Sequence, residues 1–170
     1  MEPFRLVFTA TNTPLGWLIR RVTRSTVSHV MLEYSSVVWG GRWIAEAHAA
    51  GVRKLPAKSR RHGVVIEYEF KHDISAGLRK VRHLVGAWYD VGGLFRIAYV
   101  TIMLRWFRVK VRHPMSSTRA QMCSEFIARI LKRAQYPGTS DLYTELVTPE
   151  WLLRYCRRHP ELFRKVSDAS

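Results

Sequence analysis

The stretch SHVMLEYSSVVWGGRWIAEAH, residues 28–48, decides the fold class of this chain. It holds two runs in which apolar and polar side chains alternate, and Gly40 and Gly41 stand between them. A Gly-Gly pair between two such runs is typical of a β-hairpin turn. The pattern therefore predicts two adjacent antiparallel strands, over residues 28–34 and 42–48.

The rest of the chain predicts a small antiparallel sheet packed on helices. Strands are expected over residues 4–10 and 64–70, and residues 51–63 are expected to form a basic loop. Helices are expected over 14–24, 74–88, 119–134 and 149–158, the last continuing beyond Pro160. Thr118 and Gln121 have the spacing of a capping box that would open the third helix. The order of elements predicts an α+β fold in a single domain spanning residues 1–170.

The composition excludes a disordered chain and points to anionic partners. Of the 170 residues, 47% are hydrophobic and 24% are charged, which is enough apolar material for a buried core. The 28 Lys and Arg residues outnumber the 13 Asp and Glu residues, so the net charge is +15. Such a surface attracts an anionic cell-wall polymer, an anionic membrane surface or nucleic acid. Nucleic acid is not favoured, because the basic stretches 53–61 and 154–159 are better explained as solvated faces.

The cysteine count and the N-terminus bear on compartment and cofactors. Cys123 and Cys156 are too few for a disulfide scaffold, so free thiols are expected. The sequence has no zinc-type cysteine pair and no glycine-rich phosphate loop, so neither a metal nor a cofactor is predicted. The opening MEPFRLVFTA has no long apolar core, so no secretory signal is predicted and synthesis in the cytoplasm is expected.

Three residues combine into a candidate site for thiol chemistry, although each residue type taken alone is more often structural. Cys123 lies near the start of a predicted helix, where free N–H groups and the helix dipole lower the pKa of a thiol. His29 lies on the first hairpin strand, and a neutral imidazole can take the thiol proton. Glu46 follows on the second strand, from which a carboxylate can hold the other ring nitrogen. His48 shares a strand face with Glu46 and is the alternative third residue, whereas Cys156 is expected to be a bystander.

The chain resembles the permuted branch of the NlpC/P60 papain-like superfamily, which includes the YiiX-like proteins and relatives of lecithin:retinol acyltransferase. Four stretches carry the resemblance in order, and a fifth follows them: SHVMLEY, WIAEAHAAGV, GAWYDVGGLF, MCSEFIARIL and VTPEWLL. In unpermuted relatives the cysteine helix precedes the histidine strands, whereas here it follows them. The resemblance therefore implies a circularly permuted papain-like fold, with an insertion at about residues 94–113.

The same resemblance implies roles for individual residues. Cys123 is implied as the nucleophile, His29 as the base and Glu46 as the residue that orients His29. Tyr89, in a Tyr-Asp-x-Gly-Gly stretch, is a weaker candidate for support of the oxyanion. The insertion carries tryptophan, phenylalanine and arginine side chains, and it is expected to form a lid, a partner surface, a membrane contact or a helix packed on the core.

The implied function is that of a papain-like cysteine hydrolase cleaving amide bonds in peptidoglycan peptides. The first alternative is a lipid-directed acyltransferase, phospholipase or thioesterase with the same three residues. The second is a non-enzymatic basic binding protein or virion structural protein. Because no secretory signal is predicted, a wall-directed enzyme would reach its substrate by lysis, a secretion device or a virus particle, which fits a bacterial or bacteriophage source.

Overall fold

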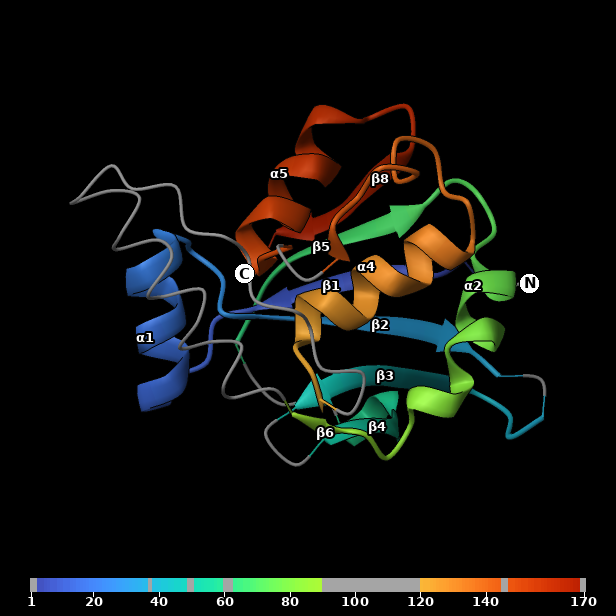
Figure 1. Cartoon of the computed structure of the whole chain (residues 1–170), viewed down its shortest axis with the longest axis horizontal. Helices are drawn as coiled ribbons and strands as arrows, with labels where there is room; N and C mark the ends of the chain where they lie inside the picture. The colour runs from blue at the N-terminus through green and yellow to red at the C-terminus, as the bar shows by residue number, and fades with distance from the viewer. Residues whose placement is uncertain are drawn as a thin grey trace.

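A six-stranded antiparallel sheet lies at the centre of the structure (Figure 1). The computed structural model describes residues 3–36, 38–48, 51–59, 63–89, 120–144 and 147–168. The strands follow the order β4-β3-β2-β1-β5-β8 across the sheet. Their bounds are Arg5–Thr9 for β1, His29–Ser35 for β2, Arg42–His48 for β3, Gly51–Pro56 for β4, Val64–Phe70 for β5 and Phe163–Asp168 for β8. A separate parallel pair joins β6, Trp88–Tyr89, to β7, Ala120–Gln121.

Helices cover one face of the sheet and one of its ends. They are α1 (Pro14–Thr23), α2 (Ser75–Lys80), α4 (Cys123–Arg133) and α5 (Pro149–Arg158), with short 3-10 turns η1 (Ala57–Ser59) and η2 (Arg82–Leu84). The central helix, α4, packs against β2 and β3 and contacts α2 and α5. By contrast, α1 lies beyond the end of the sheet at which β2 begins (Figure 1). Among the described helices, none has the length and apolar character needed to cross a bilayer.

The predicted hairpin is present. β2 and β3 pair antiparallel, with Leu32 opposite Ala45 and Ser35 opposite Arg42. In the turn Gly40 and Gly41 have φ angles of 63° and 67°, left-handed values that glycine adopts without a steric penalty. The mixed α+β class with a small antiparallel sheet is therefore confirmed.

Two helix starts also follow the sequence. Thr13 precedes Pro14 and its hydroxyl accepts a hydrogen bond from the Gly16 N–H at 3.1 Å. In the same way Thr148 precedes Pro149 and its hydroxyl accepts from the Trp151 N–H at 3.1 Å. A threonine cap followed by proline at the first helical position sets both starts, because proline has no N–H to leave unsatisfied.

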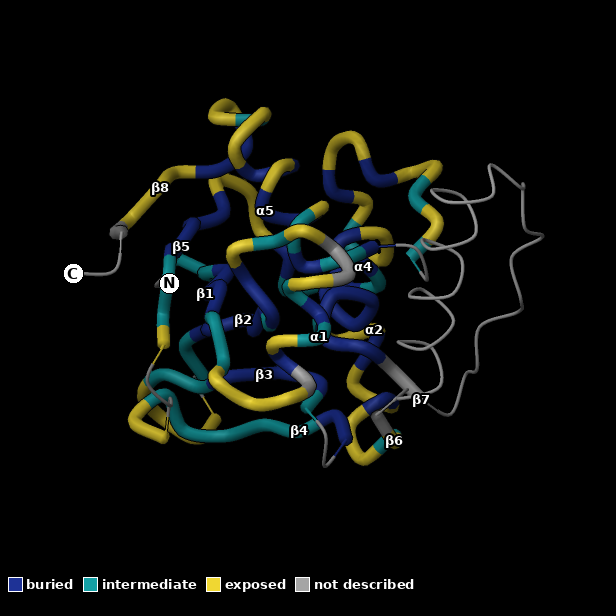
Figure 2. Tube along the Cα trace, turned by 90° about the vertical axis from the view of Figure 1, so that its left-hand side faces the viewer, coloured by how far each residue is buried: buried dark blue, intermediate teal, exposed yellow. Residues whose placement is uncertain are grey.

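Burial is concentrated on the central strands and on α4, while the edge strands β4 and β8 are largely intermediate or exposed (Figure 2). The main core contains Leu6, Val30 and Leu32, which point from the sheet toward the helices. A smaller cluster of Val7, Met31 and Ile44 lies on the opposite face. By strand alternation, His29 and Glu46 project from the face that carries the smaller cluster.

The predictions for residues 51–88 are wrong in two places. The stretch predicted as a basic loop contains β4, because Gly51 (φ 102°) lets the chain turn back beside β3. A Cβ at Gly51 would come within 2.5 Å of the Ala87 carbonyl oxygen, so this close approach requires glycine. The helix predicted over 74–88 ends at Lys80, and after η2 the chain turns at Gly86 (φ 93°) into β6.

The helix that carries Cys123 begins at Cys123 itself, four residues later than predicted. Its predicted first turn is instead strand β7, and Met122 is extended with φ −85° and ψ 157°. A capping box from Thr118 and Gln121 is therefore wrong, since Gln121 belongs to β7. The Met122 N–H instead donates to the Glu125 carboxylate at 3.5 Å. Cys123 thus stands at the first helical position rather than inside the helix.

The C-terminal segment is also not helical as predicted. Beyond Pro160 the chain forms β8, which pairs with β5, Phe163 lying opposite Phe70. Their rings lie 5.2 Å apart between centroids, and both are buried, so aromatic packing favours the strand here. The insertion expected at residues 94–113 lies outside the described residues.

Candidate active site

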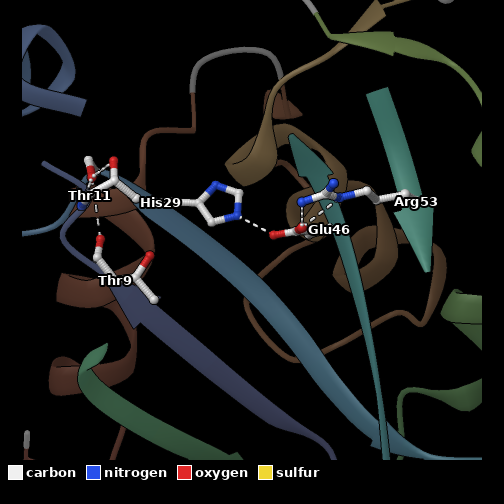
Figure 3. Close-up of polar contacts among 6 residues, drawn as sticks. Thr9, Thr11, His29, Glu46 and Arg53 are labelled. Carbon is white, nitrogen blue, oxygen red and sulfur yellow. Dashed lines mark hydrogen bonds and ion pairs between the residues drawn. The ribbon is translucent and has the colours of Figure 1, made fainter. Parts of the chain in front are cut away.

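His29 and Glu46 lie together where β2 begins. His29 is the first residue of β2, and Glu46 is on the neighbouring strand β3. The His29 Nε2 atom is 2.7 Å from Oε2 of Glu46, and Figure 3 shows the two side chains pointing at each other. Their side chains are 12% and 7% exposed, so the contact is largely shielded from water. The carboxylate occupies Nε2, which leaves Nδ1 of His29 for a different partner.

Arg53 extends this contact on its far side. From β4, its Nε and Nη2 atoms donate to Oε1 of Glu46 at 2.8 and 2.7 Å (Figure 3). Glu46 and Arg53 are directly opposite each other in the β3–β4 register, which accounts for the contact. Each carboxylate oxygen of Glu46 thus has its own nitrogen partner, so its orientation toward His29 is set from both sides.

Cys123, the first residue of α4, makes a side-chain hydrogen bond with His29. Burial raises the pKa of its thiol, but the charge and hydrogen bond of His29 and the backbone N–H groups of Val30 and Ser124 lower it overall. The Ser124 N–H belongs to the first turn of α4, where N–H groups have no partner within the helix. The thiolate form is therefore stabilised by one N–H group from β2, one N–H group from α4 and the imidazolium of His29.

The pKa values of the histidine and the carboxylate shift in the matching directions. Burial lowers the pKa of His29, but the negative charge of Cys123 and the hydrogen bond to Glu46 outweigh it and raise that pKa to about 10. For Glu46, burial again favours the neutral form, but the hydrogen bonds and charges of His29 and Arg53 lower its pKa to about 2. These shifts favour the protonated form of His29 and the ionised form of Glu46, and the pKa of the Cys123 thiol is shifted toward the thiolate.

Hydroxyl groups hold the backbone next to His29 and next to Cys123 in place. Ser28, the residue before His29, takes a hydrogen bond from the Thr11 N–H at 2.9 Å, and its own N–H donates to the Thr9 carbonyl at 2.9 Å. Figure 3 shows Thr9 and Thr11 at the end of β1 beside His29. Ser124, the residue after Cys123, donates to the Val147 carbonyl at 2.5 Å. Both His29 and Cys123 are thus held by buried neighbours rather than by exposed loops.

The two remaining candidates are His48 and Tyr89. The His48 ring lies 6.1 Å from the His29 ring between centroids, at an interplanar angle of 88°. The Nε2 atom of His29 contacts Glu46, and His48 was the alternative candidate for that position. Tyr89 is in β6 and pairs with Gln121 of β7. Gln121 lies two residues before Cys123 in the chain. The backbone of Tyr89 is therefore near the start of α4, while its side chain, the candidate for the oxyanion, lies outside the described structure.

An open cavity of about 260 Å³ lies behind the histidine, on the face of the sheet with the smaller apolar cluster. The side chains of His29, Glu46, His48 and Arg53 line one part of it, and Met31, Ile44 and Leu55 line another. The cavity gives solvent access to the side of the imidazole that faces Glu46. In the described ranges no group of three or more His, Cys, Asp or Glu residues is arranged to hold a metal ion.

Arg53 had no sequence signal of its own, because it lies in a stretch that the sequence predicts to be a basic loop. An alternation of Val52, Lys54 and Pro56 against Arg53 and Leu55 was the available sign of a strand, but Lys and Arg dilute it. The second thiol, Cys156, lies inside α5 and is buried, and burial raises its pKa.

Comparisons with known proteins do not assign this chain to a family. No protein-family model matches it, and no curated protein matches it. The chemistry of the residues at the site is therefore the basis for a proposed function.

Proposed function

We propose that this chain is a papain-like cysteine hydrolase of the permuted NlpC/P60 type, with Cys123 as nucleophile, His29 as base and Glu46 as the orienting residue. The observation that carries the proposal is the placement of a thiol with a lowered pKa, an imidazole and a carboxylate in that order. A structural histidine needs no such pair of partners, whereas a base oriented by a third group beside the nucleophile is the arrangement typical of nucleophilic catalysis by cysteine.

The residues would divide an amide hydrolysis into two steps. The Cys123 thiolate attacks the carbonyl carbon, and the N–H groups at the start of α4 face the negative charge that forms on the oxygen. As the carbon–nitrogen bond breaks, His29 gives its proton to the leaving amine, and a thioester remains on Cys123. His29 then takes a proton from water, the hydroxide attacks the thioester, and the acid leaves as the thiolate is restored. Glu46 keeps the His29 ring in one orientation through both steps.

Peptidoglycan peptides are the favoured substrate class. They lie in an anionic polymer, and the net charge of +15 would hold the protein on it at moderate ionic strength. Membrane lipid is the alternative anionic surface, and an acyl group on lipid would react with the same thiolate. The two functions use the same residues and differ in the bond that is broken, an amide bond of a peptide or an acyl bond of a lipid.

One comparison tests the proposal. Wild-type protein and Cys123→Ala are incubated in parallel with purified peptidoglycan and with phospholipid vesicles, and the products are identified by mass spectrometry. We expect new free amino and carboxyl groups in the peptidoglycan peptides with wild-type protein and none with Cys123→Ala.

Release of fatty acid from the vesicles by wild-type protein would replace the amidase assignment by the lipid alternative. If neither material gives a product that depends on Cys123, both substrate assignments are wrong. Circular dichroism of Cys123→Ala serves as the control that the variant is folded.

A further inference from the structure

The turn between β2 and β3 exposes large apolar side chains at the far end of the sheet from the candidate active site. Val38 is 86% exposed and Trp39 is 56% exposed, and they are adjacent in the chain. Figure 1 shows this turn projecting at the end of the sheet opposite α1. A hairpin turn normally carries polar residues and glycine, so two neighbouring apolar side chains in water call for a partner.

The aromatic part of the turn is ordered rather than loosely extended. The Trp39 and Trp43 rings lie 4.9 Å apart between centroids, and the Trp43 Nε1–H donates to the Gly40 carbonyl at 2.9 Å. The Trp39 N–H donates to the Ser36 hydroxyl at 3.2 Å. The turn therefore presents its apolar side chains in a fixed arrangement, so less conformational entropy is lost on contact.

One lysine side chain lies against this aromatic pair. The Lys54 ammonium group lies 5.4 Å from the centroid of the Trp39 ring. An apolar tip with tryptophan behind it and lysine beside it matches the layering of a bilayer interface, where acyl chains, carbonyl region and phosphates follow one another.

We propose that the tip formed by Val38, Trp39 and Trp43, with Lys54 beside it, attaches the protein to the surface of a membrane that contains anionic lipid. Val38 enters the boundary of the acyl chains, the two tryptophan rings lie at the level of the head groups, and Lys54 contacts lipid phosphates. A glycan would stack on the exposed tryptophan ring but would gain nothing from Val38, so lipid is the better match.

Attachment at this tip separates the membrane from the reacting thiol. His29 is at one end of β2 and the tip follows its other end, so the two are roughly 20 Å apart for a strand of this length. The tip therefore holds the protein beside a membrane while the candidate active site faces away from it. This surface is independent of the proposed hydrolase activity, and it gives an amide substrate outside the bilayer an advantage over a lipid substrate within it.

Binding to vesicles of defined composition tests the attachment. The full chain is sedimented with vesicles of phosphatidylcholine alone and with an equimolar mixture of phosphatidylcholine and phosphatidylglycerol. We expect binding to the mixture and little to phosphatidylcholine alone. The double variant Val38→Ser/Trp39→Ser should bind the mixture about tenfold more weakly or worse, because both side chains lose their apolar contact.

The matched control is Trp17→Ser, since Trp17 on α1 is 60% exposed and lies away from the tip. We expect Trp17→Ser to bind like wild-type protein. A second measurement places a dye at the tip: Val38→Cys is labelled with an environment-sensitive fluorophore in the Cys123→Ala background, with Trp17→Cys as its control. The dye at position 38 should shift to an apolar signal on the mixed vesicles, and the dye at position 17 should not.

Three results would overturn the proposal. One is equal vesicle binding by wild-type protein and the double variant, which would assign attachment to net charge alone. Another is an unchanged dye signal at position 38 on bound vesicles. The third is loss of binding to peptidoglycan, rather than to vesicles, in the double variant, which would assign the tip to a glycan. None of these results depends on hydrolase activity, so failure here is distinguishable from failure of the proposed function.

Discussion

The two cysteines of this chain are almost equally buried, with exposed fractions of 2% for Cys123 and 1% for Cys156, yet their thiols are driven in opposite directions. Burial raises the pKa of both. At Cys123 the His29 charge and two backbone N–H groups more than reverse this effect. At Cys156 burial prevails and the pKa is raised. The difference shows that position within a helix and the neighbouring charges, rather than depth, determine which thiol is reactive.

The backbone explains much of the contrast. Cys123 is the first residue of α4, where N–H groups point out of the helix end with no helical acceptor. Cys156 is the eighth of the ten residues of α5, where the N–H groups are engaged within the helix. Substitutions at the two thiols and at the neighbours of His29 test this contrast.

Removing each thiol in turn should give the largest effect. Cys123→Ala should lower the rate of the proposed amide hydrolysis by at least about 10⁴-fold, because the covalent route is lost. Cys156→Ala should leave the rate within about twofold and lower the free energy of unfolding by about 1 kcal/mol through a small cavity. Activity on purified peptidoglycan and urea unfolding measure the two quantities. Equal loss of activity in both variants would contradict the assignment of Cys123.

Alkylation rates should separate the two thiols next. Because both are equally shielded, iodoacetamide compares their charge states rather than their access. At pH 7 we expect Cys123 in Cys156→Ala to react about 100-fold faster than Cys156 in Cys123→Ala. The pH midpoint for Cys123 should lie below the ordinary thiol value of about 8.5.

His29→Gln is the control for that experiment. Without the imidazolium, burial should raise the pKa of Cys123 above its ordinary value and slow its alkylation toward that of Cys156. An unchanged rate would mean that the N–H groups alone lower the pKa of Cys123.

Arg53→Gln should have a smaller effect, because Arg53 acts through Glu46. We expect about a tenfold loss of activity, and the pKa of Glu46 should rise from about 2 toward its ordinary value of 4.5. Arg164→Gln is the matched control, since Arg164 donates to Glu69 at 2.6 Å in another Arg–Glu pair on the sheet. A pH–rate profile is the measurement: its acid limb should move upward in Arg53→Gln and stay in place in Arg164→Gln. Equal profiles in both variants would limit Arg53 to a structural role.

Acid stability should show the smallest effect. The pKa of Glu46 is lower in the folded protein than its ordinary value of 4.5, so its charge stabilises the fold above pH 4.5. This contribution is lost as the pH falls from about 4.5 through about 2. Urea unfolding should therefore show a fall in the free energy of unfolding over that range for wild-type protein and a shallower fall for Glu46→Gln. Equal slopes would mean that Glu46 is not held ionised by its neighbours.

Local patterns made half of the site predictable from the sequence. Alternation and a Gly-Gly turn are properties of neighbouring residues, and the pairing they imply brings His29 and Glu46 within reach of each other. The same reasoning predicted β1, β5 and the starts of α1 and α5, where threonine and proline supply the cap.

Contacts between distant segments account for what was missed. β7 exists because Ala120 pairs with Trp88, so the start of α4 is moved to Cys123 by a contact that no local pattern records. β8 likewise depends on β5, to which Phe163 brings an aromatic side chain. Arg53 was not predicted as a partner of Glu46, because their contact depends on the pairing of β4 with β3.

The distance along the chain between His29 and Cys123 has a consequence for synthesis of the protein. The base and the carboxylate come from a hairpin that closes a short loop, whereas the thiol arrives from a helix 94 residues after His29. Closure of a long loop is slower and comes later than that of a hairpin. Until α4 docks on β2, Cys123 is an ordinary thiol, largely protonated at neutral pH. If Cys123 is the nucleophile, as proposed, the nascent chain carries no active thiolate, and reactivity toward other proteins begins with completion of the fold.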